Sequence, residues 1–153
     1  PWATTWPSFP GTGRCPRSAR SGAAIPTAAI ERSSGVAGEA HRTYQLLIEV
    51  TKTVIVQVGR LGCFEFVAGN YIYTGSALRN FEARIQRHQS AVKKMHWHID
   101  YLLAAPGVRV REVLRYTEAE CGINQQVFGT IPVPGFGATD CRTGCGSHLK
   151  RLP

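Results

Sequence analysis

Two tyrosine-bearing segments and the short basic stretch that follows them are the residues of this sequence best placed to do chemistry. Tyr44 lies in the first segment, and the second is the run Gly69-Asn70-Tyr71-Ile72-Tyr73-Thr74-Gly75-Ser76-Ala77. Arg84, Arg87 and His88 follow soon after this run. The planar guanidinium of arginine offers a fork of N–H donors, which suits a phosphate group better than the point charge of lysine does. The arginines could therefore bind phosphate or could be surface charges of a helix, and the tyrosines could serve a site or could be aromatic residues of the core.

Cysteine and histidine side chains near the carboxyl end could bind a metal. Cys141, Cys145 and His148 offer three ligands, and Asp140 could be the fourth. Zinc prefers four ligands, and this spacing is not that of a standard zinc finger. We therefore expect a structured tail, tied to the sheet by Asp140, Ser147 and His148, rather than a zinc site.

The elements that must position these residues begin near His41. Runs rich in β-branched residues, or with alternating polarity, predict strands. The predicted strands are Thr43–Val50, Thr53–Val58, Cys63–Val67, Tyr71–Gly75 and Val108–Tyr116. Only Thr51-Lys52 separates the first two, which we expect to pair as a hairpin. In the last strand Arg109, Arg111 and Arg115 lie opposite apolar residues, which predicts one basic face.

Three segments show helical patterns. They are Leu78–Ala91, His96–Ala105 and Glu118–Phe128. Ser76 is expected to cap the first helix, in which Arg84, Arg87 and His88 lie mainly off the apolar stripe. Thr117-Glu118-Ala119-Glu120 matches a capping box that opens the third helix. This order of elements predicts an α/β domain of the α+β type, with a small, mainly antiparallel sheet flanked by about three helices.

Residues 1–40 differ from the rest of the chain. They are rich in Pro, Gly, Ser, Ala and Arg, and they lack apolar periodicity. Such a segment buries too little apolar surface to offset the entropy lost on ordering. We expect a disordered basic extension over residues 1–40 and one folded domain over residues 41–153.

Charge and composition narrow the class of partner. The formal net charge is +8, which favours a polyanion such as nucleic acid. No stretch approaches the roughly 18 apolar residues of a membrane span, so we expect no membrane partner. The amino terminus has no basic region followed by an apolar core, and the five cysteines are odd in number and scattered. We therefore expect a reducing, cytoplasmic location.

The order of these motifs resembles the GIY-YIG nuclease superfamily, in particular a divergent branch of short, poorly characterised domains. The resemblance runs from Thr43 to about Leu149. It is carried by Tyr44-Gln45-Leu46-Leu47-Ile48-Glu49-Val50, Val58-Gly59-Arg60-Leu61-Gly62, the run 69–77, Glu82-Ala83-Arg84-Ile85-Gln86-Arg87-His88, His96-Trp97-His98-Ile99-Asp100-Tyr101-Leu102-Leu103 and Pro134-Gly135-Phe136-Gly137-Ala138-Thr139-Asp140-Cys141.

The resemblance implies a small antiparallel sheet with a shallow site on its face. It implies that Tyr44 activates or carries the attacking nucleophile, that Tyr73 organises the site and that Arg84 contacts the scissile phosphate. It also implies that Glu120 holds one divalent ion, Mg²⁺ or Mn²⁺. A single glutamate is sufficient, because Mg²⁺ needs only one or two protein carboxylates. The capping box offers Glu120 another role, a bond to the backbone N–H of Thr117.

Two histidines complete the candidate catalytic set. His88 lies one helical turn after Arg84, on nearly the same helix face. His98 could serve the site or could be a buried, hydrogen-bonded structural residue. The candidate nucleic-acid-binding residues are Arg84, Arg87, Lys93, Lys94, Arg109 and Arg111.

These observations predict a domain that binds nucleic acid, DNA rather than RNA, and Mg²⁺-dependent endonuclease activity is the chemistry considered for it. Two alternatives stay open. One is a catalytically silent module that holds phosphates without cutting them. The other is an interaction protein with no nucleic-acid role.

Overall fold

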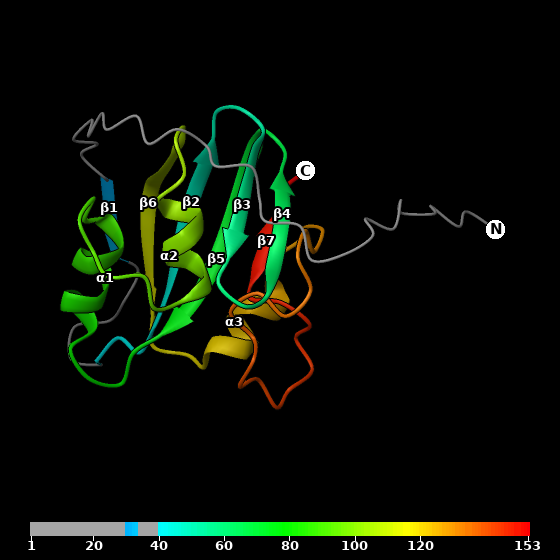
Figure 1. The fold of residues 1–153 in the computed structure, drawn as a ribbon. Helices are drawn as coiled ribbons and strands as arrows, with labels where there is room; N and C mark the ends of the chain where they lie inside the picture. Colours follow the sequence, from blue (N-terminus) through cyan, green and yellow to red (C-terminus); the bar gives the residue numbers. More distant parts are fainter. Residues whose placement is uncertain (1–29, 34–39) are drawn as a thin grey trace.

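A computed structural model describes residues 30–33 and 40–153 of the chain. Within this part, a five-stranded sheet has the order β1-β6-β2-β5-β7 (Figure 1). Neighbouring strands are antiparallel except β1 and β6, which are parallel. The strands of this sheet are β1 (Ile30–Ser33), β2 (Thr43–Val50), β5 (Gly69–Ser76), β6 (Val108–Tyr116) and β7 (Leu149–Arg151).

The central strand β2 carries the core. Tyr44, Leu46, Ile48 and Val50 alternate along it and are each at most 2% exposed, as expected for strand residues that share one covered face. Buried side chains from other elements complete the same cluster: Phe66, Ile85, Ile99, Leu102 and Phe136. Tyr44 therefore lies on the core face of β2, and its side chain points toward the helices that cover this face.

The predicted hairpin of the first two strands is wrong. Strand β3 (Val54–Val58) pairs with β4 (Gly62–Phe66) in a separate two-stranded sheet, because β5 and β6 already occupy both edges of β2. The backbone N–H and the side chain of Thr51 instead bond to the carbonyl of Gly107, at distances of 2.8 and 3.0 Å. Thr51-Lys52 thus joins two sheets.

Helix α1 (Phe81–Gln89) begins three residues later than the sequence predicts. Its N-cap is Asn80, with a left-handed backbone at φ 54°, which asparagine tolerates better than most residues do. Ser76 is the last residue of β5 and does not cap the helix. Leu78, the first residue of the predicted helix, lies outside it and is 81% exposed.

The other two helices are short. Helix α2 (His98–Leu103) ends before Pro106-Gly107, as the proline requires. Helix α3 (Glu120–Gln126) begins at Glu120 after the N-cap Ala119, and no side chain caps it. The predicted capping box is therefore wrong: the backbone N–H of Thr117 donates to Glu118, at 3.1 Å.

A β-bulge in β6 divides its arginines between the two faces of the sheet. The register with β2 shifts between Leu47 and Ile48, so that one extra residue of β6 is accommodated, and such a bulge reverses the side-chain alternation beyond it. Arg109 lies opposite Glu49, whereas Arg115 lies opposite Tyr44 on the core face. The predicted single basic face of this strand is therefore wrong.

The α+β class, the mainly antiparallel sheet and the three helices of the described residues confirm the predicted fold class. Two strands were not predicted. Strand β7 lies at the end of the expected tail, and β1 lies in the expected disordered extension. The remainder of that extension, residues 1–29 and 34–39, lies outside the described residues. No helix in the described part is long and apolar enough to cross a membrane.

Candidate functional site

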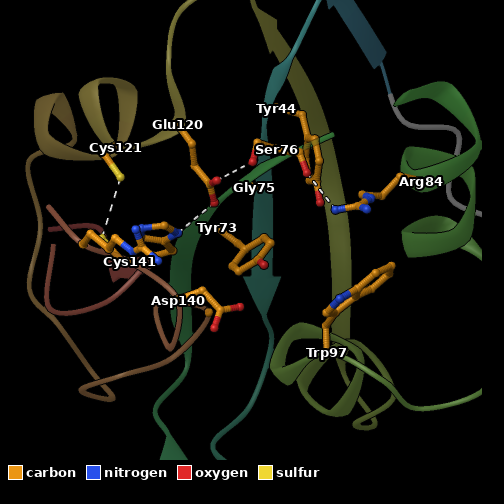
Figure 2. A pocket seen from close by; sticks show the side chains of 13 residues that line it. Tyr44, Tyr73, Gly75, Ser76, Arg84, Trp97, Glu120, Cys121, Asp140 and Cys141 are labelled. Carbon is orange, nitrogen blue, oxygen red and sulfur yellow. Dashed lines mark hydrogen bonds and ion pairs between the residues drawn. The ribbon is translucent and has the colours of Figure 1, made fainter. Parts of the chain in front are cut away.

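A cavity of about 470 Å³ opens beside the core face of the main sheet. Four predicted residues line it: Tyr44 from β2, Tyr73 from β5, Arg84 from α1 and Glu120 from α3. Figure 2 shows these four side chains around one shared space. Antiparallel pairing of β2 with β5 brings the tyrosines together. Arg84 and Glu120 approach them from opposite sides (Figure 2).

Both tyrosines are held rigidly by close packing. Tyr44 lies opposite Gly75 in the register, and a Cβ built at Gly75 would lie 2.5 Å from the Tyr44 hydroxyl. Tyr73 is packed in the same way against Gly137, where a Cβ would lie 2.8 Å from its ring. Burial raises the pKa of both phenols above the ordinary value of 10. Both side chains are therefore neutral at pH 7.

His88 lies behind Tyr44 and bonds to it. Its Nε2 is 2.8 Å from the Tyr44 hydroxyl, and the residue is only 2% exposed. Burial, followed by the positive charge of Lys93, lowers the pKa of His88 to about 4. The imidazole is therefore neutral at pH 7, with one nitrogen able to accept a proton.

Asp100 lies near the other ring nitrogen of His88, which has no hydrogen-bond partner among the described residues. Its Oδ1 lies 3.9 Å from His88 Nδ1, and the fork of Arg87 donates to both its oxygens, at 2.9 and 3.0 Å. The backbone N–H groups of His96 and Trp97 also donate to Asp100. Burial would raise the pKa of Asp100, but these bonds outweigh it and hold the pKa below its ordinary value. Arg87 therefore positions Asp100 instead of facing the cavity.

Arg84 is oriented by two contacts. Its Nη1 donates to the backbone carbonyl of Ser76 at 2.7 Å, and its guanidinium carbon lies 4.7 Å from the ring centroid of Trp97. Stacking on an aromatic face fixes the plane of the guanidinium. The guanidinium also interacts with the Tyr44 hydroxyl and lowers its pKa, against the larger effect of burial. Because Arg84 lines the cavity, its N–H donors can meet a ligand there.

Glu120 is bonded on both carboxylate oxygens. One oxygen accepts from the hydroxyl of Ser76, and the other lies 2.8 Å from His148 Nδ1. Burial would raise the pKa of Glu120, but the bonds from His148 and Ser76 outweigh it and hold the pKa below its ordinary value. Glu120 is therefore an anion at pH 7 that faces the cavity.

The other predicted residues lie away from the cavity. His98 Nδ1 accepts from the backbone N–H of Gly137, at 3.1 Å, and so supports the loop that packs on Tyr73. Lys93 donates to the carbonyls of Arg87 and His88 at the end of α1. Lys94 is exposed beyond the end of that helix.

Arg109 and Arg111 do not face the cavity either. Both bond to Glu49, with shortest distances of 2.6 and 3.1 Å. Glu49 is five residues from Tyr44 in an unbroken strand, so the two side chains point to opposite faces of the sheet. The two arginines therefore lie on the face opposite the tyrosine site.

Several lining residues were not among the candidate site residues named from the sequence. They include Ser76, Trp97, Cys121, Asp140 and His148. The signal for Trp97 is its place close after the basic stretch, because an arginine can form a cation–π contact with an aromatic ring. Nothing in the local sequence indicates that Cys121 lies beside Cys141, twenty residues later.

A family model described as a domain of unknown function, DUF123, matches residues 43–153. The chain belongs to the DUF123 family. No curated protein and no solved structure matches it. The DUF123 range begins with β2 and contains every residue that lines the cavity. The family domain thus holds the complete candidate site.

Proposed function

We propose that this chain binds nucleic acid, DNA rather than RNA, and hydrolyses a phosphodiester bond with one Mg²⁺ or Mn²⁺ ion. The proposal includes the link to GIY-YIG nucleases. The observation that carries it is the meeting of Tyr44, Tyr73, Arg84 and Glu120 around one cavity. These residues come from four elements spread over 77 positions of sequence. The resemblance in motif order nevertheless assigns all four of them to one catalytic site.

Arg84 would hold the scissile phosphate. Its plane is fixed by Ser76 and Trp97, so it presents N–H donors to the cavity without further ordering. Donors fixed in advance stabilise the charge that develops on phosphate oxygens in the transition state. A guanidinium is the side chain best suited to this task.

Tyr44 would activate the attacking water by taking a proton from it, and would pass its own hydroxyl proton to His88. The Tyr44 hydroxyl is 2.8 Å from His88 Nε2, which is neutral and can accept its proton. Burial opposes this transfer, because it raises the pKa of the phenol and lowers that of the imidazole. Positive charge near the phenolate, including that of Arg84, favours the transfer. Tyr73 would order this side of the cavity.

Glu120 would hold the divalent ion, and Asp140 lines the same cavity as a second carboxylate. Carboxylate oxygens are the ligands that Mg²⁺ prefers. Both Glu120 oxygens already accept a hydrogen bond, but each retains a further lone pair, so the residue fits the role. When bound, the ion supplies positive charge to the phosphate oxygens.

The test is cleavage by the purified chain with Mg²⁺ or Mn²⁺, on flap, branched and single-stranded DNA and on RNA. Tyr44→Phe and Arg84→Ala are each expected to slow cleavage by about 10²–10³-fold, as the loss of a transition-state contact does. Tyr101→Phe and Arg111→Ala are matched controls, because neither residue lines the cavity. Both controls should cleave at the parent rate.

If every substrate stays intact, the enzyme claim fails for those substrates. Salt-dependent binding would then support the catalytically silent module, which the raised pKa of Tyr44 favours. No binding to DNA or RNA would support the interaction protein.

A further inference from the structure

Four metal-ligating side chains gather at the edge of the candidate site. Cys121 comes from α3, while Cys141, Cys145 and His148 come from the segment that leads into β7. Their ligand atoms all lie within 4.8 Å of one another. The sulfurs of Cys121 and Cys141 are 3.7 Å apart, close to the roughly 3.8 Å between sulfurs that each lie about 2.3 Å from a tetrahedral zinc ion.

We propose that Cys121, Cys141, Cys145 and His148 bind one structural zinc ion. Four protein ligands close a tetrahedral site and leave no position for substrate, which is the pattern of structural rather than catalytic zinc. This proposal is independent of the proposed nuclease function. It reverses the expectation from sequence, which found three of the ligands and considered Asp140 as the fourth.

The surroundings of His148 support this assignment. The residue is 4% exposed, and its Nε2 is buried without a hydrogen-bond partner among the described residues. Its other ring nitrogen, Nδ1, bonds to Glu120 at 2.8 Å. Histidine ligands of zinc almost always pass their second nitrogen to a carboxylate, a carbonyl or water, which fixes the ring. Nε2 is therefore the atom left for the ion, and its missing partner is explained.

The loop between the ligands is shaped to bring them together. Gly144 and Gly146 have left-handed backbones, at φ 74° and 72°, a conformation that other residues rarely adopt. They flank Cys145 and fold it back toward Cys141. In addition, the side-chain amide of Gln125 lies 3.9 Å from the Cys145 sulfur and can donate to it.

The chemical types of the four ligands indicate zinc as the bound metal. Three thiolates and an imidazole are soft ligands that favour zinc, whereas Mg²⁺ takes oxygen ligands. Ligand atoms this close together enclose a single ion rather than an iron–sulfur cluster. The bound ion would join α3 to the segment before β7, and through His148 it would fix Glu120 at the cavity wall.

The first experiment measures metal content in the purified full chain by elemental analysis. We expect one zinc per chain in the parent protein and near-complete loss in Cys121→Ser and His148→Ala. His148→Cys should retain zinc, because it exchanges one zinc ligand for another. Asp140→Asn is the matched control and should also retain it.

The second experiment uses the parent chain alone, so that it stays decisive if a variant does not fold. Zinc is replaced by Co²⁺, and the expected result is the sulfur-to-cobalt charge-transfer absorption of a tetrahedral thiolate site. Zinc retained by Cys121→Ser, or absence of this absorption, would overturn the proposal. So would a metal-free protein in which mass spectrometry finds a Cys121–Cys141 disulfide. Neither measurement involves nucleic acid, so the zinc proposal stands even if the nuclease proposal fails.

Discussion

At the scale of single residues, the candidate site depends on groups whose neighbours change their ordinary chemistry. Tyr44 and His88 are both buried and both neutral at pH 7, and they share one hydrogen bond. Asp100 lies close to the second nitrogen of His88 and is itself held by Arg87. Asp100, His88 and Tyr44 thus lie in a row between the Arg87–Asp100 ion pair and the cavity.

The burial of His88 predicts a loss of stability in acid. Its pKa is about 4 in the folded chain and about 6.5 when unfolded, so below pH 6.5 the unfolded chain binds the extra proton first. The free energy of unfolding should therefore fall as the pH drops from 6.5 toward 4, by up to about 3 kcal/mol from this residue. Urea unfolding at several pH values measures it.

His88→Gln is the comparison for this prediction. It removes the titrating group but keeps a polar side chain beside Tyr44. All other ionisable groups remain, so the difference between the two acid profiles isolates His88. Equal acid sensitivity in the two proteins would contradict the prediction.

At the scale of elements, two local irregularities of the sheet position the site residues: the bulge in β6 and a glycine in β5. The bulge in β6 turns Arg115 to the core face, where it pairs with Glu82 of α1 at 2.9 Å. Without the bulge, Arg115 would share a face with Arg109. In β5, Gly75 leaves room for the Tyr44 ring of the adjacent strand. One inserted residue and one missing Cβ therefore decide where α1 and Tyr44 can lie.

Two glycines in different elements should respond oppositely to alanine. Gly75→Ala would press a Cβ against the Tyr44 hydroxyl, and we expect a loss of about 1–3 kcal/mol in the free energy of unfolding. Gly122 lies in α3 with nothing within 4 Å of a built Cβ, so Gly122→Ala should gain up to about 1 kcal/mol. Urea unfolding of both variants tests this, and a Gly75→Ala protein as stable as the parent would refute the packing argument.

At the scale of the whole molecule, the cavity forms where separate parts of the chain meet. The sheet supplies the tyrosines, α1 supplies Arg84, and α3 with the segment before β7 supplies Glu120 and the cysteines. The arginines of β6 that bond to Glu49 lie on the opposite face. The two faces of the sheet should therefore contribute unequally to any binding of a polyanion.

The salt dependence of DNA binding measures this difference between the two faces of the sheet. For duplex DNA, the logarithm of the binding constant should fall linearly with the logarithm of the salt concentration, with a slope of about −0.9 per phosphate contacted. Arg84→Ala should reduce the magnitude of this slope by about one. Arg111→Ala, on the far face, should leave it unchanged. A larger effect from Arg111→Ala would move the binding surface to that face.

The sequence determined those features that depend on local pattern. Apolar alternation gave the core strand Thr43–Val50, and helical periodicity gave the existence of all three helices. The order of motifs also singled out Tyr44, Tyr73, Arg84 and Glu120, which do line one cavity. The predictions of the strand and the helices held because each depends on residues a few positions apart. The roles of the four cavity residues stay predictions.

Only the tertiary structure decided which groups meet across the chain. The two-residue linker Thr51-Lys52 predicted that the first two strands pair as a hairpin. Both edges of β2 are instead paired with β5 and β6, which are distant in sequence. Arg87 and Arg109 looked alike in sequence as phosphate ligands, yet each is held by a carboxylate away from the cavity. Cys121 joins Cys141 only because α3 packs beside the segment before β7. Long-range packing sets such contacts, and no local spacing encodes them.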